Sequence, residues 1–341
     1  MYYTPVLVCL GCIGNVLSVF VFFRTKLRKL SSSYYLSALA ISDTIFLLSL
    51  LIMWLNFYGI RISNEPGMCQ LLVYASGASS CMSVWSVVAF TVERFVAVLY
   101  PLRRQAVCTV ARARAVLCGL IALALLHSAP LLLFSQPIYK KELNATICDV
   151  AEDYREAASV FNTLDTVVAF LVPLTIIVVL NSCTACAVWR LAGIRRSMTV
   201  TGRGGSRYFC EERDALQGIP FPGTTTVCKL RRKKPVTSNS CSSQMKVTKM
   251  LLIVSTVFVC LNLPSYVMRL RAFIESDEPP SRTTVIIQYY CAIFFNTNFG
   301  INFALYCVSG QNFRRAVASM LCPSRTNDWY RSRQSALDID L

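Results

Sequence analysis

The sequence predicts an all-α membrane protein, a seven-transmembrane helix bundle with an amphipathic helix eight. The first observation is composition, because 55% of the 341 residues are hydrophobic and only 15% are charged, whereas soluble domains carry about 25% charged residues. The second is a mean hydropathy of +0.50. These figures exclude a disordered chain and a small secreted disulfide scaffold, because neither contains so much apolar surface.

The third observation is the number of long apolar stretches. A helix rises about 1.5 Å per residue, so roughly 20 mostly apolar residues cross a hydrocarbon core of about 30 Å. Seven stretches have this length: 2–23, 34–58, 68–100, 111–134, 157–189, 245–274 and 284–308. Backbone polar groups in lipid need partners within their own segment, and the alternation of a barrel strand is missing, so we predict helices.

Basic residues are distributed unevenly between the two sides of these spans. Of 34 lysines and arginines, 27 fall on one side, and 13 of those lie between Arg190 and Lys249. Because cytoplasmic loops are rich in Lys and Arg, we expect an extracellular N-terminus and a cytoplasmic C-terminus. The glycosylation sequon at Asn144 then lies outside. The net charge of +16 is therefore explained by topology and by membrane lipid, without nucleic acid.

We expect one transmembrane domain over residues 1–322 and a short cytoplasmic tail over 323–341. The segment 191–244 is rich in Gly, Ser, Thr and basic residues and lacks helical periodicity, which predicts a disordered cytoplasmic loop. After the seventh span, Phe313 and other apolar residues share one face of a short segment beside two arginines, which predicts the interfacial helix eight. Cys322 at its end is a candidate palmitoylation site.

Polar side chains inside a membrane span are costly and usually functional, and four of those in the predicted spans are considered first. Asp43 is in the middle of the second span, Asn15 is in the first, and Asn298 and Asn302 are four residues apart on one face of the seventh. They predict either a buried polar core that switches between two packings around a cation, or plain hydrogen bonding between helices. For Asp43 we favour the functional interpretation.

The third span ends in an adjacent acid and base, Glu93 and Arg94. Alone, this pair is equally typical of an arginine that reaches lipid headgroups from a helix end. Other motifs stand in a fixed order along the chain: Gly14-Asn15-Val16, Leu39-Ala40 before Asp43, Cys69, Glu93-Arg94-Phe95, Tyr100-Pro101-Leu102, Pro130, Pro173, Phe258 with Pro264, Asn302 through Tyr306, and Phe313-Arg314. Through this ordered set the chain resembles a rhodopsin-like, class A G-protein-coupled receptor over essentially its whole length.

The chain departs from that family's pattern at a few positions. An aliphatic residue near Leu120 stands in place of the fourth-helix tryptophan, and Asn181 stands in place of a fifth-helix tyrosine. Asn262 replaces the sixth-helix tryptophan, and Phe303 replaces the seventh-helix proline. The last two changes resemble invertebrate neuropeptide receptors, in the neighbourhood of the CNMamide receptor or the FMRFamide and thyrotropin-releasing-hormone receptors. They bear on the activation switch and leave the class unchanged.

The resemblance implies roles for individual residues. Cys69 and Cys148 would form the disulfide between the third helix and the second outer loop. G-protein coupling and the activation switch would involve Glu93, Arg94, Phe95, Phe258, Asn262, Pro264, Asn302 and Tyr306. A candidate allosteric sodium ion, the one cofactor implied, would lie among Asp43, Ser83, Asn298 and Asn302. The implied partners are a heterotrimeric G protein, arrestin and a receptor kinase, and the implied location is the plasma membrane.

Amine receptors of this family carry an aspartate where this chain has Ser76, which disfavours an amine ligand. The last span has no lysine to hold retinal. Arg269 suits a ligand carboxylate or amide carbonyl, and Asp165 suits a basic ligand group. The alternative for both is pairing with each other or with the loops. The remaining walls of the ligand site are expected to be formed by Trp54, Tyr74, Tyr266, Gln288 and Tyr289. Several polar anchors around a wide opening favour an extracellular peptide ligand.

Three other classes were weighed against a peptide receptor. A receptor for a non-peptide small molecule is the main alternative. A channel or transporter predicts charge rings, inverted repeats or broken helices, and none is visible in the sequence. An enzyme is not expected, because the one histidine, His127, stands outside any metalloprotease, hydrolase or Walker motif. We interpret His127 as a helix-packing residue.

Overall fold

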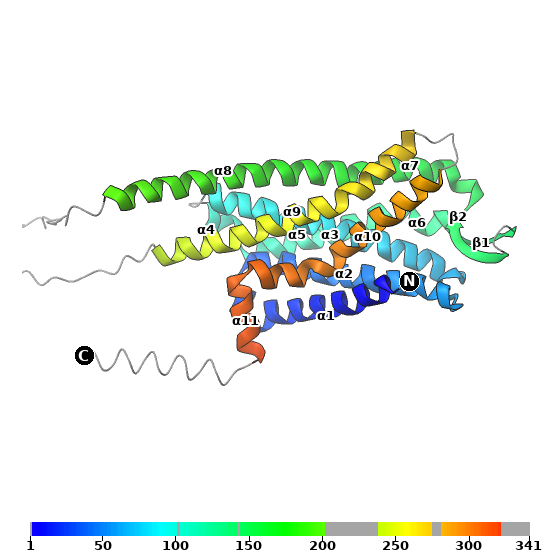
Figure 1. The fold of residues 1–341 in the computed structure, drawn as a ribbon, viewed down its shortest axis with the longest axis horizontal. Helices are drawn as coiled ribbons and strands as arrows, with labels where there is room; N and C mark the ends of the chain where they lie inside the picture. The colour runs from blue at the N-terminus through cyan, green and yellow to red at the C-terminus, as the bar shows by residue number, and fades with distance from the viewer. Residues whose placement is uncertain (1, 101–102, 142–143, 202–237, 275–280, 322–341) are drawn as a thin grey trace, which may run out of the picture.

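The computed structural model describes residues 2–100, 103–141, 144–201, 238–274 and 281–321. Within these ranges, seven helical segments are long and apolar enough to cross a membrane. They run side by side and form one elongated bundle (Figure 1). The seven-helix fold predicted from the sequence is confirmed.

Each of the seven membrane-crossing segments consists of one to three helical elements. The first three crossings are α1 (Tyr3–Arg24), α2 (Ser31–Trp54) and α3 (Met68–Leu99). After the short α4 (Arg104–Val107), the fourth crossing consists of α5 (Val110–Ser128) and α6 (Leu131–Phe134). The fifth consists of α7 (Arg155–Thr166), a π-helical turn (Val167–Leu171) and α8 (Val172–Thr201). The last two are α9 (Ser238–Ile274) and α10 (Arg282–Ser309).

Helices α8 and α9 run further than the sequence analysis expected. Residues 191–201 continue α8, and residues 238–244 begin α9, although both ranges were assigned to the loop 191–244. The range 202–237 between them lies outside the described residues, as do Cys322 and the predicted tail 323–341.

The fifth crossing changes its helical geometry just before Pro173. Proline has no N–H to give to the carbonyl four residues earlier, which here belongs to Ala169. That carbonyl accepts the hydroxyl of Tyr266 from α9 at 3.4 Å. The ring of Phe170 then stacks on the ring of Tyr266, with centroids 3.9 Å apart and planes 7° apart. The proline and the π-helical turn together connect the fifth crossing to the sixth.

Glycines allow α1 and α10 to approach closely. A Cβ on Gly11 would lie 2.9 Å from the Cα of Gly300, and a Cβ on Gly14 would lie 2.8 Å from the Cβ of Phe303. Both distances are too short for real carbon atoms, so a larger residue at Gly11 requires a backbone shift. Phe303, which replaces the family's proline, fills the space beside Gly14.

Helix α11 (Gln311–Leu321) turns across the end of α1 (Figure 1). Its Phe313 is buried against the rings of Tyr306 and Phe22, at centroid distances of 5.5 and 5.4 Å. Its Arg314 donates to the carbonyls of Cys307 and Val308, which have no partner further along α10. This is the predicted helix eight, and we call this end of the bundle the α11 end.

A β-hairpin at the opposite end was not foreseen in the all-α prediction. Strands β1 (Ser135–Lys140) and β2 (Ala145–Val150) pair antiparallel. Asn144, just before β2, has a positive φ of 45°, a conformation that asparagine tolerates well. β-Branched and aromatic residues on both sides of Asn144 are the sequence signal that could have revealed the strands. We call this end the hairpin end.

Candidate functional site

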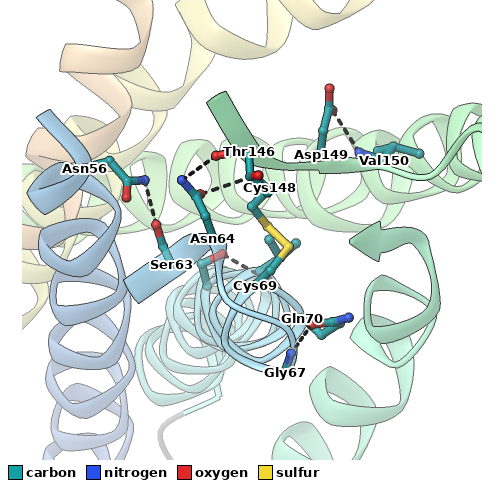
Figure 2. The surroundings of a disulfide bond; sticks show 12 residues. Asn56, Ser63, Asn64, Gly67, Cys69, Gln70, Thr146, Cys148, Asp149 and Val150 are labelled. Carbon is teal, nitrogen blue, oxygen red and sulfur yellow. Dashed lines mark hydrogen bonds between the residues drawn. A yellow bond between two sulfur atoms is a disulfide. The ribbon is translucent and has the colours of Figure 1, made fainter. Parts of the chain in front are cut away.

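The hairpin is fixed to α3 by a disulfide and by one asparagine (Figure 2). Cys69 at the start of α3 bonds to Cys148 in β2, with Cα atoms 5.5 Å apart, which confirms the predicted pair. Asn64, in the turn before α3, donates to the Thr146 carbonyl at 2.9 Å and accepts from the Cys148 amide at 3.2 Å. Asn64 therefore pairs with β2 much as a neighbouring strand would, a contact that the sequence analysis missed.

Two cavities open next to each other below the hairpin. The first has a volume of about 380 Å³ and lies between α7, α9 and α10. The second has a volume of about 390 Å³ and is lined mainly by α3, α5, α6, α7 and α9, with one residue each from α2 and α10. Asn162, Tyr266, Arg269 and Phe295 line both cavities. These four residues therefore form the partition between two compartments of similar size.

An ionic cluster joins three helices at this partition. Arg269 Nη1 on α9 lies 3.1 Å from Asp165 Oδ2 on α7, and His127 Nε2 on α5 donates to the other oxygen, Oδ1, at 3.1 Å. The guanidinium also lies over the Tyr266 ring, 5.5 Å from its centroid. Both oxygens of Asp165 thus have partners in the chain, whereas the Arg269 side chain stays 42% exposed. The predicted pairing alternative for Asp165 and Arg269 is the observed one, and His127 belongs to it.

The structure brings together five of the eight predicted ligand residues. Ser76 and Asp165 line the second cavity, Gln288 lines the first, and Tyr266 and Arg269 line both. The other three side chains lie outside both linings. Trp54 packs on Tyr58, Tyr74 donates to the Leu125 carbonyl, and Tyr289 is exposed beside Tyr290. Asn162 and Phe295 are lining residues that the sequence analysis did not name.

A second polar group lies in the middle of the bundle around Asp43, which is fully buried. Ser83 on α3 donates to Asp43 Oδ1 at 2.7 Å, and the Asn302 amide on α10 donates to Oδ2 at 2.7 Å. Asn298 joins this group through its carbonyl, which accepts from Asn302 at 3.4 Å. No cationic side chain among the described residues pairs with Asp43, so its charge is left for a small cation or for a proton. The carboxylate, hydroxyl and carbonyl oxygens here are the donor type that sodium prefers.

Near the α11 end, the last turns of α3 carry a local ion pair. Arg94 Nη2 donates to Glu93 Oε1 at 2.6 Å, and both side chains are largely buried. The Nε atom of Arg94 is buried without a hydrogen-bond partner. Phe95, the third residue of the motif, meets the ring of Tyr100 edge to face. Glu93 and Arg94 therefore pair with each other, and the Nε donor of Arg94 is left without a partner among the described residues.

Comparison with protein families decides between the classes. Residues 14–306 match the model of the family described as 7 transmembrane receptor (rhodopsin family). The chain belongs to that family. It is therefore a receptor and a multi-pass plasma-membrane protein, and the prediction that it is not an enzyme is confirmed.

Individual relatives cover nearly the whole receptor at low identity. Somatostatin receptor type 4 of Rattus norvegicus is 25% identical over 93% of this chain and 71% of its own length. Growth hormone secretagogue receptor type 1 of Rattus norvegicus is 26% identical over 91% and 77%. Thyrotropin-releasing hormone receptor of Bos taurus is 24% identical over 91% and 75%. The invertebrate subtype inferred from the sequence stays a prediction.

The remaining residues predicted to act in the activation switch lie along α9 and α10. Asn262 is buried, and its amide donates to the Phe258 carbonyl at 2.7 Å, while its own Oδ1 has no partner. Pro264 follows within the same helix. Tyr306 is fully buried, and its hydroxyl also has no partner. Where the family's tryptophan would fill space with a ring, Asn262 leaves an unused acceptor in the core.

Proposed function

We propose that the receptor binds an extracellular peptide at the hairpin end and activates a heterotrimeric G protein at the α11 end. The observation that carries this proposal is the pair of adjoining cavities with Arg269 on their partition. Two compartments of about 380–390 Å³ suit a ligand with several side chains, since one compartment alone already has the size of a small-molecule site. The three relatives are named for peptide hormones or for a secretagogue, which supports a peptide.

The charges of the cavity walls favour a ligand acceptor group over a ligand cation. Asp165 already holds His127 and Arg269 with its two oxygens, so a basic ligand group would have to displace one of them. The planar guanidinium of Arg269 has N–H groups besides the one that bonds to Asp165. Their arrangement suits a carboxylate or a peptide carbonyl of the ligand. Among the described residues that line the first cavity, Arg269 is the one charged residue, and the others are neutral.

The proposed topology has the N-terminus and hairpin outside and the C-terminus in the cytoplasm. The basic bias of the loops supports it, and so does a disulfide at the hairpin end, since disulfides persist in oxidising compartments. Asn144 is exposed in the hairpin and becomes a glycosylation site in this orientation. Arrestin and a receptor kinase would act at the opposite end, and a sodium ion at Asp43 would stabilise the closed bundle.

Two arginine variants test the two halves of this proposal. Membranes with the full-length receptor are screened with a panel of short amidated peptides, using calcium and cyclic-AMP readouts, and the strongest activator is kept as the probe. Arg94→Ala should abolish nucleotide exchange while probe binding stays near wild type. Arg269→Ala should raise the probe concentration for half-maximal response by about tenfold or more, the expected size for a lost charge-assisted hydrogen bond.

Arg271→Ala is the matched control, because it removes the same charge from the same helix, two residues away. An unchanged dose–response for Arg269→Ala would remove this residue from the binding site. A receptor that responds only to non-peptide compounds would favour the small-molecule alternative, and ligand-gated ion flux without G protein would contradict the proposal.

A further inference from the structure

A pair of polar side chains connects α9 to α8 in the half of the bundle toward the α11 end. Asn181 on α8 donates from its Nδ2 to Ser255 Oγ on α9 at 2.8 Å. Ser255 is 1% exposed and Asn181 is half-buried, so this bond is partly shielded from water. Helix α9 otherwise packs chiefly against α10 and much less against α8. The Asn181–Ser255 bond is therefore a polar contact within a sparse α8–α9 interface.

This bond lies directly beside Arg94. A cavity of about 10 Å³, close to the smallest space that holds one water, is lined by Arg94, Asn181 and Ser255 together with four other side chains. The space next to the α3 motif is thus almost completely filled while α9 stays in place. A cytoplasmic protein that needs to reach Arg94 from this side finds no room until α9 moves away.

The closed arrangement also contains an unfavourable feature. The Nε atom of Arg94 is buried and has no partner among the described residues, and an unmade hydrogen bond on a buried charged group is costly. Movement of α9 would admit water or a protein partner to this atom. Because closure leaves Arg94 unsatisfied, it needs an opposing favourable contact, and the Asn181–Ser255 bond is located where it can supply one.

We propose that the Asn181–Ser255 bond is the inner latch of this receptor, holding α9 over Arg94 until ligand binding pulls it away. Pro264 lies nine residues after Ser255 in the same helix and interrupts its backbone hydrogen bonds, so the half that carries Ser255 can swing separately from the half that lines the cavities. The inference rests on the proposed G-protein coupling. It gives Asn181 a positioning role in this chain, where the family's tyrosine is absent.

The test measures nucleotide exchange without any ligand. Full-length receptor in lipid nanodiscs is incubated with purified heterotrimers from each main G-protein class. Ser255→Ala and Asn181→Ala should each raise basal exchange roughly three- to tenfold, the change in equilibrium expected for one lost hydrogen bond. The double variant should rise no further than the stronger single variant, because both substitutions remove the same bond. Ser182→Ala is the matched control, since that exposed hydroxyl bonds within its own helix.

A distance measurement separates failure of the latch from failure of the coupling proposal. Spin labels carried by unnatural amino acids at the exposed positions Trp189 on α8 and Thr256 on α9 report the separation of the helices. Ser255→Ala should increase the population of long distances relative to Ser182→Ala. Unchanged distances and unchanged basal exchange overturn the latch. A shifted distance distribution, with no exchange by any variant on any G protein, supports the latch and overturns the proposed coupling.

Discussion

The hairpin end and the α11 end of the bundle surround the same helix, α9, in opposite ways. At the hairpin end the helices leave two cavities of about 380 and 390 Å³, and Asp165 in the ionic cluster is 26% exposed. At the α11 end the space beside Arg94 is about 10 Å³. Helix α9 lines the space at both ends, so the proposed signal between the two ends requires movement of α9.

The open hairpin end depends on a covalent bond that the closed end does not need. Replacing Cys69 and Cys148 together by serine frees a loop of 79 residues, and we expect a loss of about 2–4 kcal/mol in stability. The measurement is thermal unfolding of purified receptor in detergent, together with probe binding. An equal loss for the double variant Cys183→Ser, Cys186→Ser, which removes two exposed thiols on α8, would contradict this assignment.

The contact between α1 and α10 is expected to be intolerant of added volume, unlike the cavities. Gly11→Val should destabilise the receptor by about 1–3 kcal/mol, because the new side chain meets the backbone of Gly300. Gly119→Ala is the control, since a Cβ at Gly119 meets nothing within 4 Å. It should be neutral or slightly stabilising. Similar melting temperatures for the two variants would show that α1 shifts freely.

The smallest expected effect concerns an ion pair within the hairpin. Lys140 donates to Asp149, and this bond holds the pKa of the Asp149 carboxyl below its usual range. Stability from this pair is present above about pH 4, the ordinary aspartate range, and is lost as the pH falls through the lowered pKa. Because the side chains are 40% and 38% exposed, we expect only about 0.2–0.5 kcal/mol.

Hydrogen exchange of β2 amides in the wild type and in Asp149→Asn checks this effect. After correction for the intrinsic exchange rates, protection should be weaker in the variant at neutral pH and equal in both below about pH 3. A difference that persists in acid would show that the amide substitution disturbs the hairpin in another way.

The fold was predictable because membrane spans are long and their chemistry is restricted. Twenty apolar residues in a row have few structural alternatives, and ordered motifs such as Asn15, Asp43 and Arg94 then fixed the family. The β-hairpin was missed because its strands are six residues long and one of them contains Pro137. A short strand in a loop outside the membrane does not need a long apolar stretch, so its sequence is less distinctive.

The candidate site was predictable only in part. The position of a residue along a helix is easier to infer from the sequence than the neighbouring helix that its side chain faces. Trp54, Tyr74 and Tyr289 were expected to line the ligand site, but they lie outside both cavity linings. The prediction that His127 packs between helices agrees with its ring lying beside that of Phe161. Its bond to Asp165 was not predicted, because nothing in the sequence pairs the fourth span with the fifth. Both misses concern which helix faces meet, which depends on the packing of all seven helices.

Fixing β2 through both Cys148 and Asn64 has a kinetic consequence. A strand fastened at two points to the start of α3 does not have to open before a ligand reaches the cavities. We therefore expect association in a single phase at the ordinary rate for pre-organised sites, about 10⁵–10⁷ M⁻¹s⁻¹. Differences in affinity between related ligands should then appear as residence time, set by how long the contacts at Arg269 persist.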